Sequence, residues 1–185
     1  MRLFLAVFPS PAAQGAAFAG IESLRRPGDR VSWVQRQNLH YTMRFLGEVG
    51  EDGLRRASEA ARQAAAAHAP FDAALGALGA FPSPRRARVL WIGMTLGEPP
   101  LLALAESLAA ALERRGFARE GRAFAAHLTL GRVREPGPDW SARLESFRVD
   151  AAAARFRVDR LCVVESRLDP AGSVYTVREE AKLAG

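Results

Sequence analysis

The chain has 185 residues, of which 49% are hydrophobic and 25% charged, values that exclude wholesale disorder and suit one sizeable domain. Its net charge of +6 comes almost entirely from arginine, because Lys182 is the only lysine. The lack of an internal lysine excludes a Walker A phosphate loop and Schiff-base chemistry. Arginine-rich surface suits a polyanion, although a genome rich in G and C produces the same composition.

The first half of the chain is predicted to form strand 2–8, helix 11–26, strands 31–34 and 39–46, and helix 51–68. The apolar run of the first strand is too short for a signal peptide or a membrane span. Ser10 is the predicted N-cap of the first helix, with Pro11 at its first position. We therefore expect a cytoplasmic protein that does not contact a membrane.

The second half is predicted to form strands 71–81 and 88–96, helix 99–116, strand 127–133, a short helix ending near 146, and strands 158–167 and 173–178. The first two of these strands flank a turn with a basic tip, Arg85-Arg86. The last two form a hairpin around residues 169–172, whose Asp, Pro and Gly fit a type I turn. Because the elements do not alternate strictly as βαβ and several strands look antiparallel, the predicted fold class is α+β.

A weak internal repeat relates the two halves of the chain. Residues 38–47, NLHYTMRFLG, resemble residues 125–133, AAHLTLGRV. Their histidines, His40 and His127, are 87 residues apart (127 − 40), which is close to half the chain. The simplest explanation is a duplicated architecture with two lobes.

Both repeats contain a histidine followed by a threonine two positions later. The chain has only three histidines and four threonines, so chance would give two such triplets roughly once in a thousand sequences of this composition. Side chains two apart on a strand point to the same face, so His40 would lie beside Thr42 and His127 beside Thr129. Each lobe would thus present one imidazole next to one hydroxyl.

This pairing suits the hydrolysis of a cyclic phosphodiester. The reaction needs a base that deprotonates water on one side of phosphorus and an acid that protonates the departing ribose oxygen on the other. Histidine serves as either near neutral pH, and threonine hydroxyls donate to the non-bridging oxygens where charge develops. No metal or cofactor is expected, since the sequence has no HExxH or CxxC motif and no carboxylate cluster near either histidine.

Structural roles compete with the catalytic one. A single histidine on a strand is more often a core residue than a catalyst, and only the pair of motifs favours catalysis. His68 has no threonine partner and is predicted to be a helix C-terminal cap or a surface residue. Cys162 lies in an apolar run and is predicted to be a small core residue, not a nucleophile.

The two motifs resemble the signatures of a known family. Residues 38–49 are similar to the first signature of the RNA 2′,3′-cyclic phosphodiesterases, also called 2′-5′ RNA ligases, which belong to the two-histidine phosphoesterase superfamily. Residues 127–132 resemble the second signature. Further similarity covers residues 1–6, 81–91, 165–168 and 174–177, and so extends over nearly the whole chain.

The resemblance implies an α+β fold in a single domain, residues 1–185, with two lobes related by a pseudo-two-fold axis. Two antiparallel sheets would face a central cleft lined by both histidine motifs, with the helices outside. The implied activity is the hydrolysis of RNA 2′,3′-cyclic phosphate ends to 2′-phosphomonoesters. The implied partner is RNA with such ends, and the protein is expected to be a monomer that needs no metal.

The resemblance also assigns the catalytic pair. His40 would protonate the leaving ribose oxygen and His127 would activate water, although the sequence alone leaves open which histidine is the acid. Two other functions stay open: ATP-independent 2′-5′ RNA ligation by the same pair, and RNA-end binding without catalysis. The residues implied to bind the substrate phosphate are Thr42, Thr129 and Arg132.

The position of Arg132 in the second motif corresponds to that of Phe45 in the first. Arg132 follows the second threonine by three residues, and Phe45 follows the first by three. The resemblance implies a phosphate contact for Arg132, and a base or ribose contact for Phe45. Strand alternation alone places Arg132 on the face opposite His127, so we expect a β-bulge near Gly131 or the end of the strand there.

Overall fold

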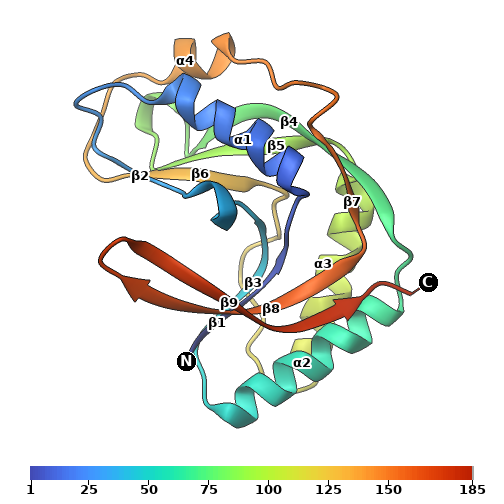
Figure 1. The fold of residues 1–185 in the computed structure, drawn as a ribbon. Coiled ribbons are helices and arrows are strands. Elements are labelled where there is room, and N and C mark those ends of the chain that lie inside the picture. The colour runs from blue at the N-terminus through green and yellow to red at the C-terminus, as the bar shows by residue number, and fades with distance from the viewer. Residues whose placement is uncertain (185) are drawn as a thin grey trace.

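The computed structural model describes residues 1–184, which form nine strands, four α-helices and two short 3₁₀ helices (Figure 1). The strands are β1 (Arg2–Val7), β2 (Val31–Trp33), β3 (Tyr41–Glu48), β4 (Phe71–Phe81), β5 (Val89–Leu96), β6 (Leu128–Val133), β7 (Arg155–Val158), β8 (Arg160–Asp169) and β9 (Gly172–Lys182). The helices are α1 (Pro11–Leu24), α2 (Glu51–Ala66), α3 (Glu98–Glu113), α4 (Ser141–Ser146), and the 3₁₀ helices η1 (Arg36–Asn38) and η2 (Pro84–Arg86). This mixture of helices and strands confirms the α+β class.

Most predicted elements are present, and the differences have local causes. Ser10 caps α1 as predicted, because its hydroxyl accepts a hydrogen bond from the Ala13 amide at 3.2 Å. β3 begins two residues later than predicted, because the chain first turns through η1. The sequence prediction lacks β7, an edge strand of four residues in which Phe156 and Val158 are buried between exposed arginines.

All nine strands belong to one curled antiparallel sheet in the order β7-β4-β5-β6-β3-β1-β8-β9, with β2 paired to β6. The two sheets expected from the sequence are here two halves of a single sheet. The halves join where β3 meets β6, through the residue pair Tyr41 and Leu128. The buried Tyr41 hydroxyl also donates to the Gly93 carbonyl on β5 at 3.3 Å, so this side chain fastens both halves.

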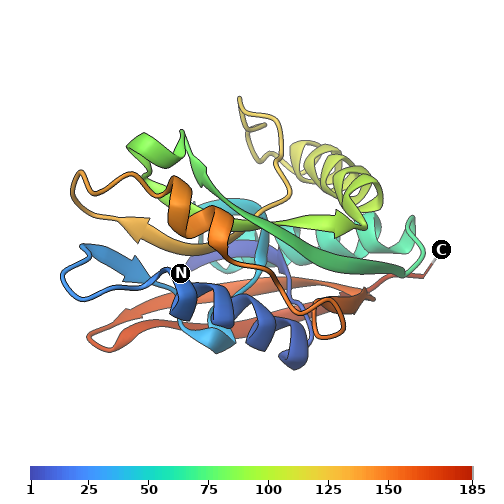
Figure 2. The ribbon, with the colours of Figure 1, turned by 90° about the horizontal axis from the view of Figure 1, so that it is seen from above.

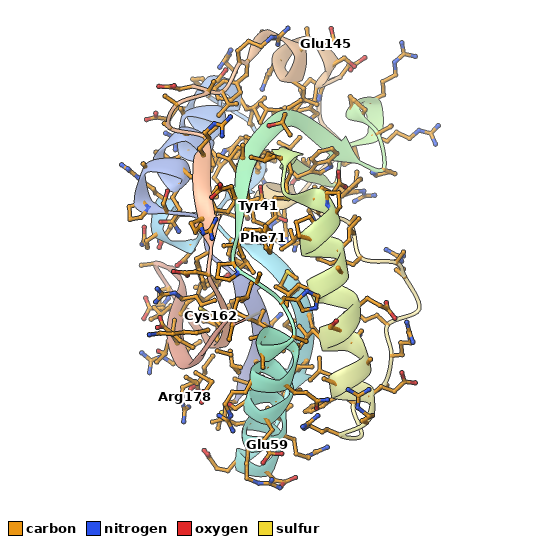
Figure 3. The ribbon with its side chains drawn as sticks, turned by 90° about the vertical axis from the view of Figure 1, so that its right-hand side faces the viewer. Tyr41, Glu59, Phe71, Glu145, Cys162 and Arg178 are labelled. Carbon is orange, nitrogen blue, oxygen red and sulfur yellow. The ribbon has the colours of Figure 1, made fainter. Side chains whose placement is uncertain are left out.

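The helices lie outside the curl of the sheet (Figures 1 and 2). α1 follows β1 in the chain but packs on β4 and β6 in the other half, and α3 follows β5 but contacts β3. Each of these two helices therefore contacts the half-sheet opposite to that of the strand before it. α2 with Glu59 and α4 with Glu145 lie at opposite ends of the molecule (Figure 3). Within residues 1–184, no helix combines the length and the apolar character that crossing a membrane requires.

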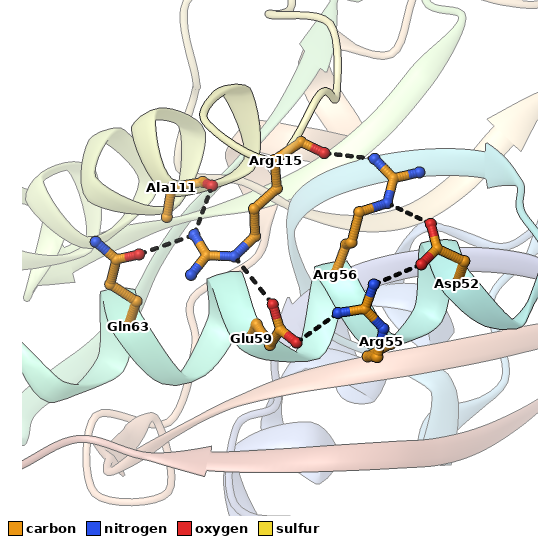
Figure 4. A network of polar contacts seen from close by, with 7 residues as sticks. All are labelled: Asp52, Arg55, Arg56, Glu59, Gln63, Ala111 and Arg115. Carbon is orange, nitrogen blue, oxygen red and sulfur yellow. Dashed lines mark hydrogen bonds and ion pairs between the residues drawn. The ribbon is translucent and has the colours of Figure 1, made fainter.

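A polar network fastens α2 to the end of α3 (Figure 4). Arg115 donates to the Gln63 side chain at 2.8 Å and lies 3.6 Å from the Glu59 carboxylate. Arg56 donates to the Arg115 carbonyl and to Asp52. Exposed ion pairs such as Arg56–Asp52 stabilise a fold little. The network nevertheless holds Arg115, after which the chain leaves α3 and runs to the second histidine motif.

Alternation along β1 defines the two sides of the sheet. Leu3 and Leu5 are buried in the main core against the helices. Phe4 and Ala6 instead pack in a second, smaller cluster with Cys162 and its neighbours. We call the side of the sheet that carries Phe4, Ala6 and Cys162 the inner face. It is the face turned away from the main core.

Candidate active site

His40 lies immediately before β3, with its imidazole fixed at both nitrogens. Nδ1 is 2.6 Å from the Asn38 carbonyl, which only accepts, so Nδ1 carries a proton. In the neutral ring Nε2 then has a free lone pair, and it lies 2.8 Å from the Thr42 hydroxyl. Asn38 is held in turn, because its amide donates to the Ser173 carbonyl of the β8–β9 hairpin at 2.7 Å. The hairpin thus orients the His40 backbone.

His127 is held in the same way before β6. Its Nδ1 lies 2.9 Å from the carbonyl of Ala125, again two residues upstream, so Nδ1 is the protonated nitrogen of the neutral ring. Nε2 of His127 has no hydrogen-bond partner within the described residues. Both imidazoles therefore present Nε2, the nitrogen that would exchange a proton, on the inner face: that of His127 has no partner among residues 1–184, and that of His40 accepts from the Thr42 hydroxyl.

The junction of the two half-sheets brings both motifs together. Tyr41 and Leu128 form the pair that joins β3 to β6, and both are fully buried. Residues that flank such a pair point to the opposite face, so each histidine and its threonine lie on the inner face. The antiparallel register, carried one residue further, places His40 across from Thr129 and Thr42 across from His127.

A β-bulge follows each threonine at the same position. In β6, β5 residues Trp91 and Leu90 pair with Thr129 and Gly131, so Leu130 is the extra residue. In β3, Ala6 and Leu5 of β1 pair with Thr42 and Arg44, so Met43 is the extra residue. A bulge reverses the alternation beyond it. The bulge expected near Gly131 is therefore present, and the first motif has its counterpart.

The two bulges turn the third residue after each threonine to the inner face. Arg132 pairs with Val89, which shares a face with Trp91 two residues on, and Phe45 pairs with Phe4. Both side chains are exposed; the exposed fraction of Phe45 is 45%. Glycine is required at position 131, because a Cβ there would lie 2.8 Å from side-chain atoms of both Trp33 and Val31 of β2. The predicted site residues thus lie on one face.

Aromatic rings enclose His40. The ring centroids of Phe4, Phe8 and Tyr175 lie 4.8, 5.5 and 5.5 Å from its own. This burial lowers the pKa of His40 below the ordinary 6.5, and the hydrogen bond to the Asn38 carbonyl opposes the shift. The free protein therefore favours neutral His40 at neutral pH.

Aromatic rings also flank His127, on the other half-sheet. Phe81 lies edge-on at 5.1 Å and Trp91 at 6.5 Å between ring centroids. Burial lowers the pKa of His127 below 6.5, the Ala125 carbonyl opposes this, and the positive charge of Arg132 lowers the pKa further. That electrostatic effect agrees with Arg132 and His127 sharing the inner face.

The flanking aromatic residues were beyond sequence reasoning. Their spacing from the motifs carries no signal, because Phe4 and Tyr175 come from opposite ends of the chain and meet through β1, β8 and β9. One local sign exists for Trp91. Its indole lies over Gly79 on β4, where a Cβ would collide with the ring. Glycine in a strand often marks such a close approach.

The other reactive side chains lie elsewhere or in apolar surroundings. Cys162 is 3% exposed in the small cluster, and burial raises the pKa of its thiol to about 11, as suits a core residue. His68 follows the C-cap of α2, Ala67, and its half-buried ring bonds the Ser107 hydroxyl of α3 at 2.8 Å. Within residues 1–184, no group of three or more potential metal-ligating side chains occurs.

The motifs do not line the cavity beside α3. This cavity, of about 410 Å³, lies between α3, the outer side of β3 at Met43 and Arg44, and the segment 119–124. The histidines instead lie on the exposed inner face of the sheet. Such a face suits an extended substrate better than a small enclosed ligand.

Comparison with known proteins identifies the relatives of this chain. The family model for the 2′-5′ RNA ligase superfamily matches residues 9–170. The chain belongs to this superfamily. Among curated superfamily relatives, the RNA 2′,3′-cyclic phosphodiesterase of Methanothermobacter thermautotrophicus is 33% identical over 99% of both chains. That of Archaeoglobus fulgidus is 34% identical over 95% of this chain and 96% of its own.

Solved structures share the fold of this chain. A crystal structure of a Thermus thermophilus protein matches with a TM-score of 0.83 and 32% identity, covering 100% of this chain and 99% of the other. E. coli LigT in complex with 3′-AMP matches with a TM-score of 0.79, covering 100% and 98%. At 24% identity, the second likeness concerns the fold alone.

Proposed function

We propose that this protein hydrolyses 2′,3′-cyclic phosphate ends of RNA to 2′-phosphomonoesters. The observation that carries the proposal is the mirrored pair of histidine–threonine motifs across the β3–β6 junction, each with Nδ1 bonded to a backbone carbonyl and Nε2 as the nitrogen left for proton exchange. The curated relatives that match over nearly the full chain are RNA 2′,3′-cyclic phosphodiesterases, which supports the same substrate.

In the proposed reaction the two histidines have opposite roles. Nε2 of His127 takes a proton from water as its oxygen attacks phosphorus. The bond from phosphorus to the ribose 3′-oxygen breaks on the opposite side, and His40 in its protonated form gives that oxygen its proton. The product keeps the phosphate on the 2′-oxygen. The hydrogen bonds at Nδ1 fix both rings in the orientation that this exchange requires.

The remaining inner-face residues are proposed to bind the substrate. Thr129 would donate to the non-bridging oxygens, whose charge grows in the transition state. Thr42 would do the same once protonation of His40 frees the Thr42 hydroxyl from donating to Nε2. Arg132 would add a charged, forked donor to the same oxygens. Phe45, at the equivalent position of the other half, would contact the base or ribose through its exposed ring. The proposed reaction uses no metal and no nucleotide cofactor.

The same observations support a duplicated origin for the single domain. The order of strands outward from the junction, the bulge after each threonine and the crossed packing of α1 and α3 all repeat in the two halves. We propose two interleaved lobes related by a pseudo-two-fold axis through the junction. We also propose that the protein works as a monomer in the cytoplasm, where its RNA substrates occur.

The proposed pair predicts an acidic pH optimum for kcat/KM. Burial lowers both histidine pKa values, so the imidazolium needed as the acid forms in the free enzyme only below the ordinary 6.5. The bell-shaped profile should therefore peak below pH 6.5, with two apparent pKa values that belong to the coupled pair. The anionic substrate favours imidazolium, so the profile of kcat should peak at higher pH. A kcat/KM maximum well above pH 7 would contradict this account.

Hydrolysis is expected without metal or ATP, because the two imidazoles supply both the acid and the base. The assay uses an RNA with a 2′,3′-cyclic end, excess EDTA and no nucleotide, followed by end-group analysis. A 2′-phosphate end supports the proposal. If the main product is the RNA joined to an added RNA with a 5′-hydroxyl end, the protein is a ligase. If the protein binds the cyclic-ended RNA but leaves it unchanged, it is an RNA-end binder. Activity lost in EDTA and restored by one divalent metal would refute the mechanism.

A further inference from the structure

Arg2 is a cation on the inner face that the proposed reaction does not use. It alternates with Leu3 on β1 and so shares a face with Phe4 and Ala6. Its neighbour across the strands, Glu48, lies 3.3 Å from the α-amino group of Met1. Within residues 1–184, Arg2 forms no ion pair with a carboxylate, so its charge is available to a ligand.

The guanidinium of Arg2 lies over the ring of Phe45, a residue between Arg2 and the proposed phosphate site. Its Cζ lies 5.2 Å from the centroid of the Phe45 ring. Phe45 pairs with Phe4, in the row of residues between that of Arg2 and that of Thr42. Rows on one face of a strand repeat about every 7 Å. Arg2 thus lies roughly two such rows from Thr42, and its long side chain covers part of that distance over Phe45.

Tyr175 connects Arg2 with the second inner-face arginine. Ser166 pairs with Arg2 on one side and with Tyr175 on the other, so the three form one row. Burial raises the pKa of Tyr175, while the positive charges of Arg132 and Arg2 lower it, so both cations act on its hydroxyl. The inner face therefore carries two arginines near one tyrosine, one cation on each half of the sheet.

We propose that Arg2, with Tyr175 and Ser166, binds the internucleotide phosphate on the 5′ side of the terminal nucleotide. This inference rests on the proposed function, because it takes the cyclic phosphate to lie between the two threonines. If His40 protonates the ribose oxygen, the ribose lies over the β3 half of the sheet. The phosphate on its 5′-oxygen then extends over the same half, toward Arg2. The guanidinium fork matches phosphate oxygens.

The subsite predicts a preference for oligonucleotides over cyclic mononucleotides. The assay compares kcat/KM for a dinucleotide that ends in a 2′,3′-cyclic phosphate with that for the 2′,3′-cyclic mononucleotide. The dinucleotide should be better by roughly tenfold, the effect of one charge-assisted contact. Arg2→Met keeps the apolar stem over Phe45 and should reduce this ratio nearly to one. Arg2→Lys should restore part of it.

A change in the substrate gives an independent control for folding. A methylphosphonate linkage removes the internal negative charge of the dinucleotide. With this substrate the wild-type protein should no longer prefer the dinucleotide, and the kcat/KM of Arg2→Met should equal that of wild type. Arg114→Met, at an exposed position on the end of α3, should keep the wild-type ratio.

Three results would overturn the inference. The wild-type ratio could be one, or Arg2→Met could keep the full ratio. The third result is that Arg88→Met, at the exposed residue just before β5, abolishes the ratio while Arg2→Met does not. In each case both substrates are still hydrolysed. If wild-type protein hydrolyses neither substrate, the proposed function itself fails, and the inference fails with it.

Discussion

His40→Ala and His127→Ala should each lower kcat on a cyclic-ended RNA by roughly 10²- to 10⁴-fold, the usual contribution of one general acid or base. Each imidazole is held at Nδ1 by a backbone carbonyl and presents Nε2 on the inner face, at His40 against the Thr42 hydroxyl. The loss should appear in kcat, measured under saturating substrate by end-group analysis. Substrate binding should change less.

The double variant sharpens this prediction. If the two histidines act as a unit, His40→Ala/His127→Ala should be little worse than either single variant, since one missing partner already stops the concerted transfer. His68→Ala is the matched control. Its ring bonds Ser107 between α2 and α3, away from both motifs, so it should keep turnover within a few-fold and affect stability instead. Additive losses in the double variant would contradict concerted action.

Thr42→Ala, Thr129→Ala and Arg132→Lys should each lower kcat, the threonine variants by roughly 10- to 1000-fold. The threonines lie on the inner face next to the histidines, where the non-bridging oxygens of the phosphate would lie. Arg132→Lys replaces a planar fork with a single ammonium, which loses the paired contact while keeping the charge. Circular dichroism should show an unchanged fold, because Thr42 and Arg132 are exposed.

Matched positions on the outer side of the molecule provide the controls for these variants. Thr176 is exposed on β9, one residue from the inner-face Tyr175, so Thr176→Ala should keep wild-type turnover. Arg114→Lys should do the same at the end of α3. Wild-type rates in all three inner-face variants would mean that these side chains only support the fold.

The sequence predicts most of this fold because its signals are local. Proline and Ser10 mark the start of α1, and apolar runs mark the central strands. Long-range contacts are not predicted from the sequence. The two half-sheets join through the pair of Tyr41 with Leu128, which no local pattern specifies. The edge strand β7 is also missed, since four residues carry too few alternations to stand out.

The site, too, has features that the sequence predicts and features that only the folded chain shows. Repetition of the motif identifies the histidines and threonines, and parity on a strand predicts the need for a bulge before Arg132. The bulge after Thr42, which turns Phe45 to the same face, follows only from the pairing with β1. The rings of Phe4 and Tyr175 around His40 come from distant strands. Their effect on the histidine pKa therefore needs the folded chain.

The division of labour between the histidines is the central claim, and a substrate with an activated leaving group tests it. A nitrophenyl phosphodiester releases an oxygen that needs no proton, so an enzyme without its general acid can still cleave it. The comparison measures kcat/KM of both alanine variants on this ester and on the cyclic RNA end, relative to wild type.

If His40 is the acid and His127 the base, His40→Ala should recover most of its lost rate on the nitrophenyl ester, while His127→Ala should remain as slow as on RNA. The reverse pattern would exchange the two roles. Equal recovery of both variants, or of neither, would contradict the acid–base division proposed for this pair.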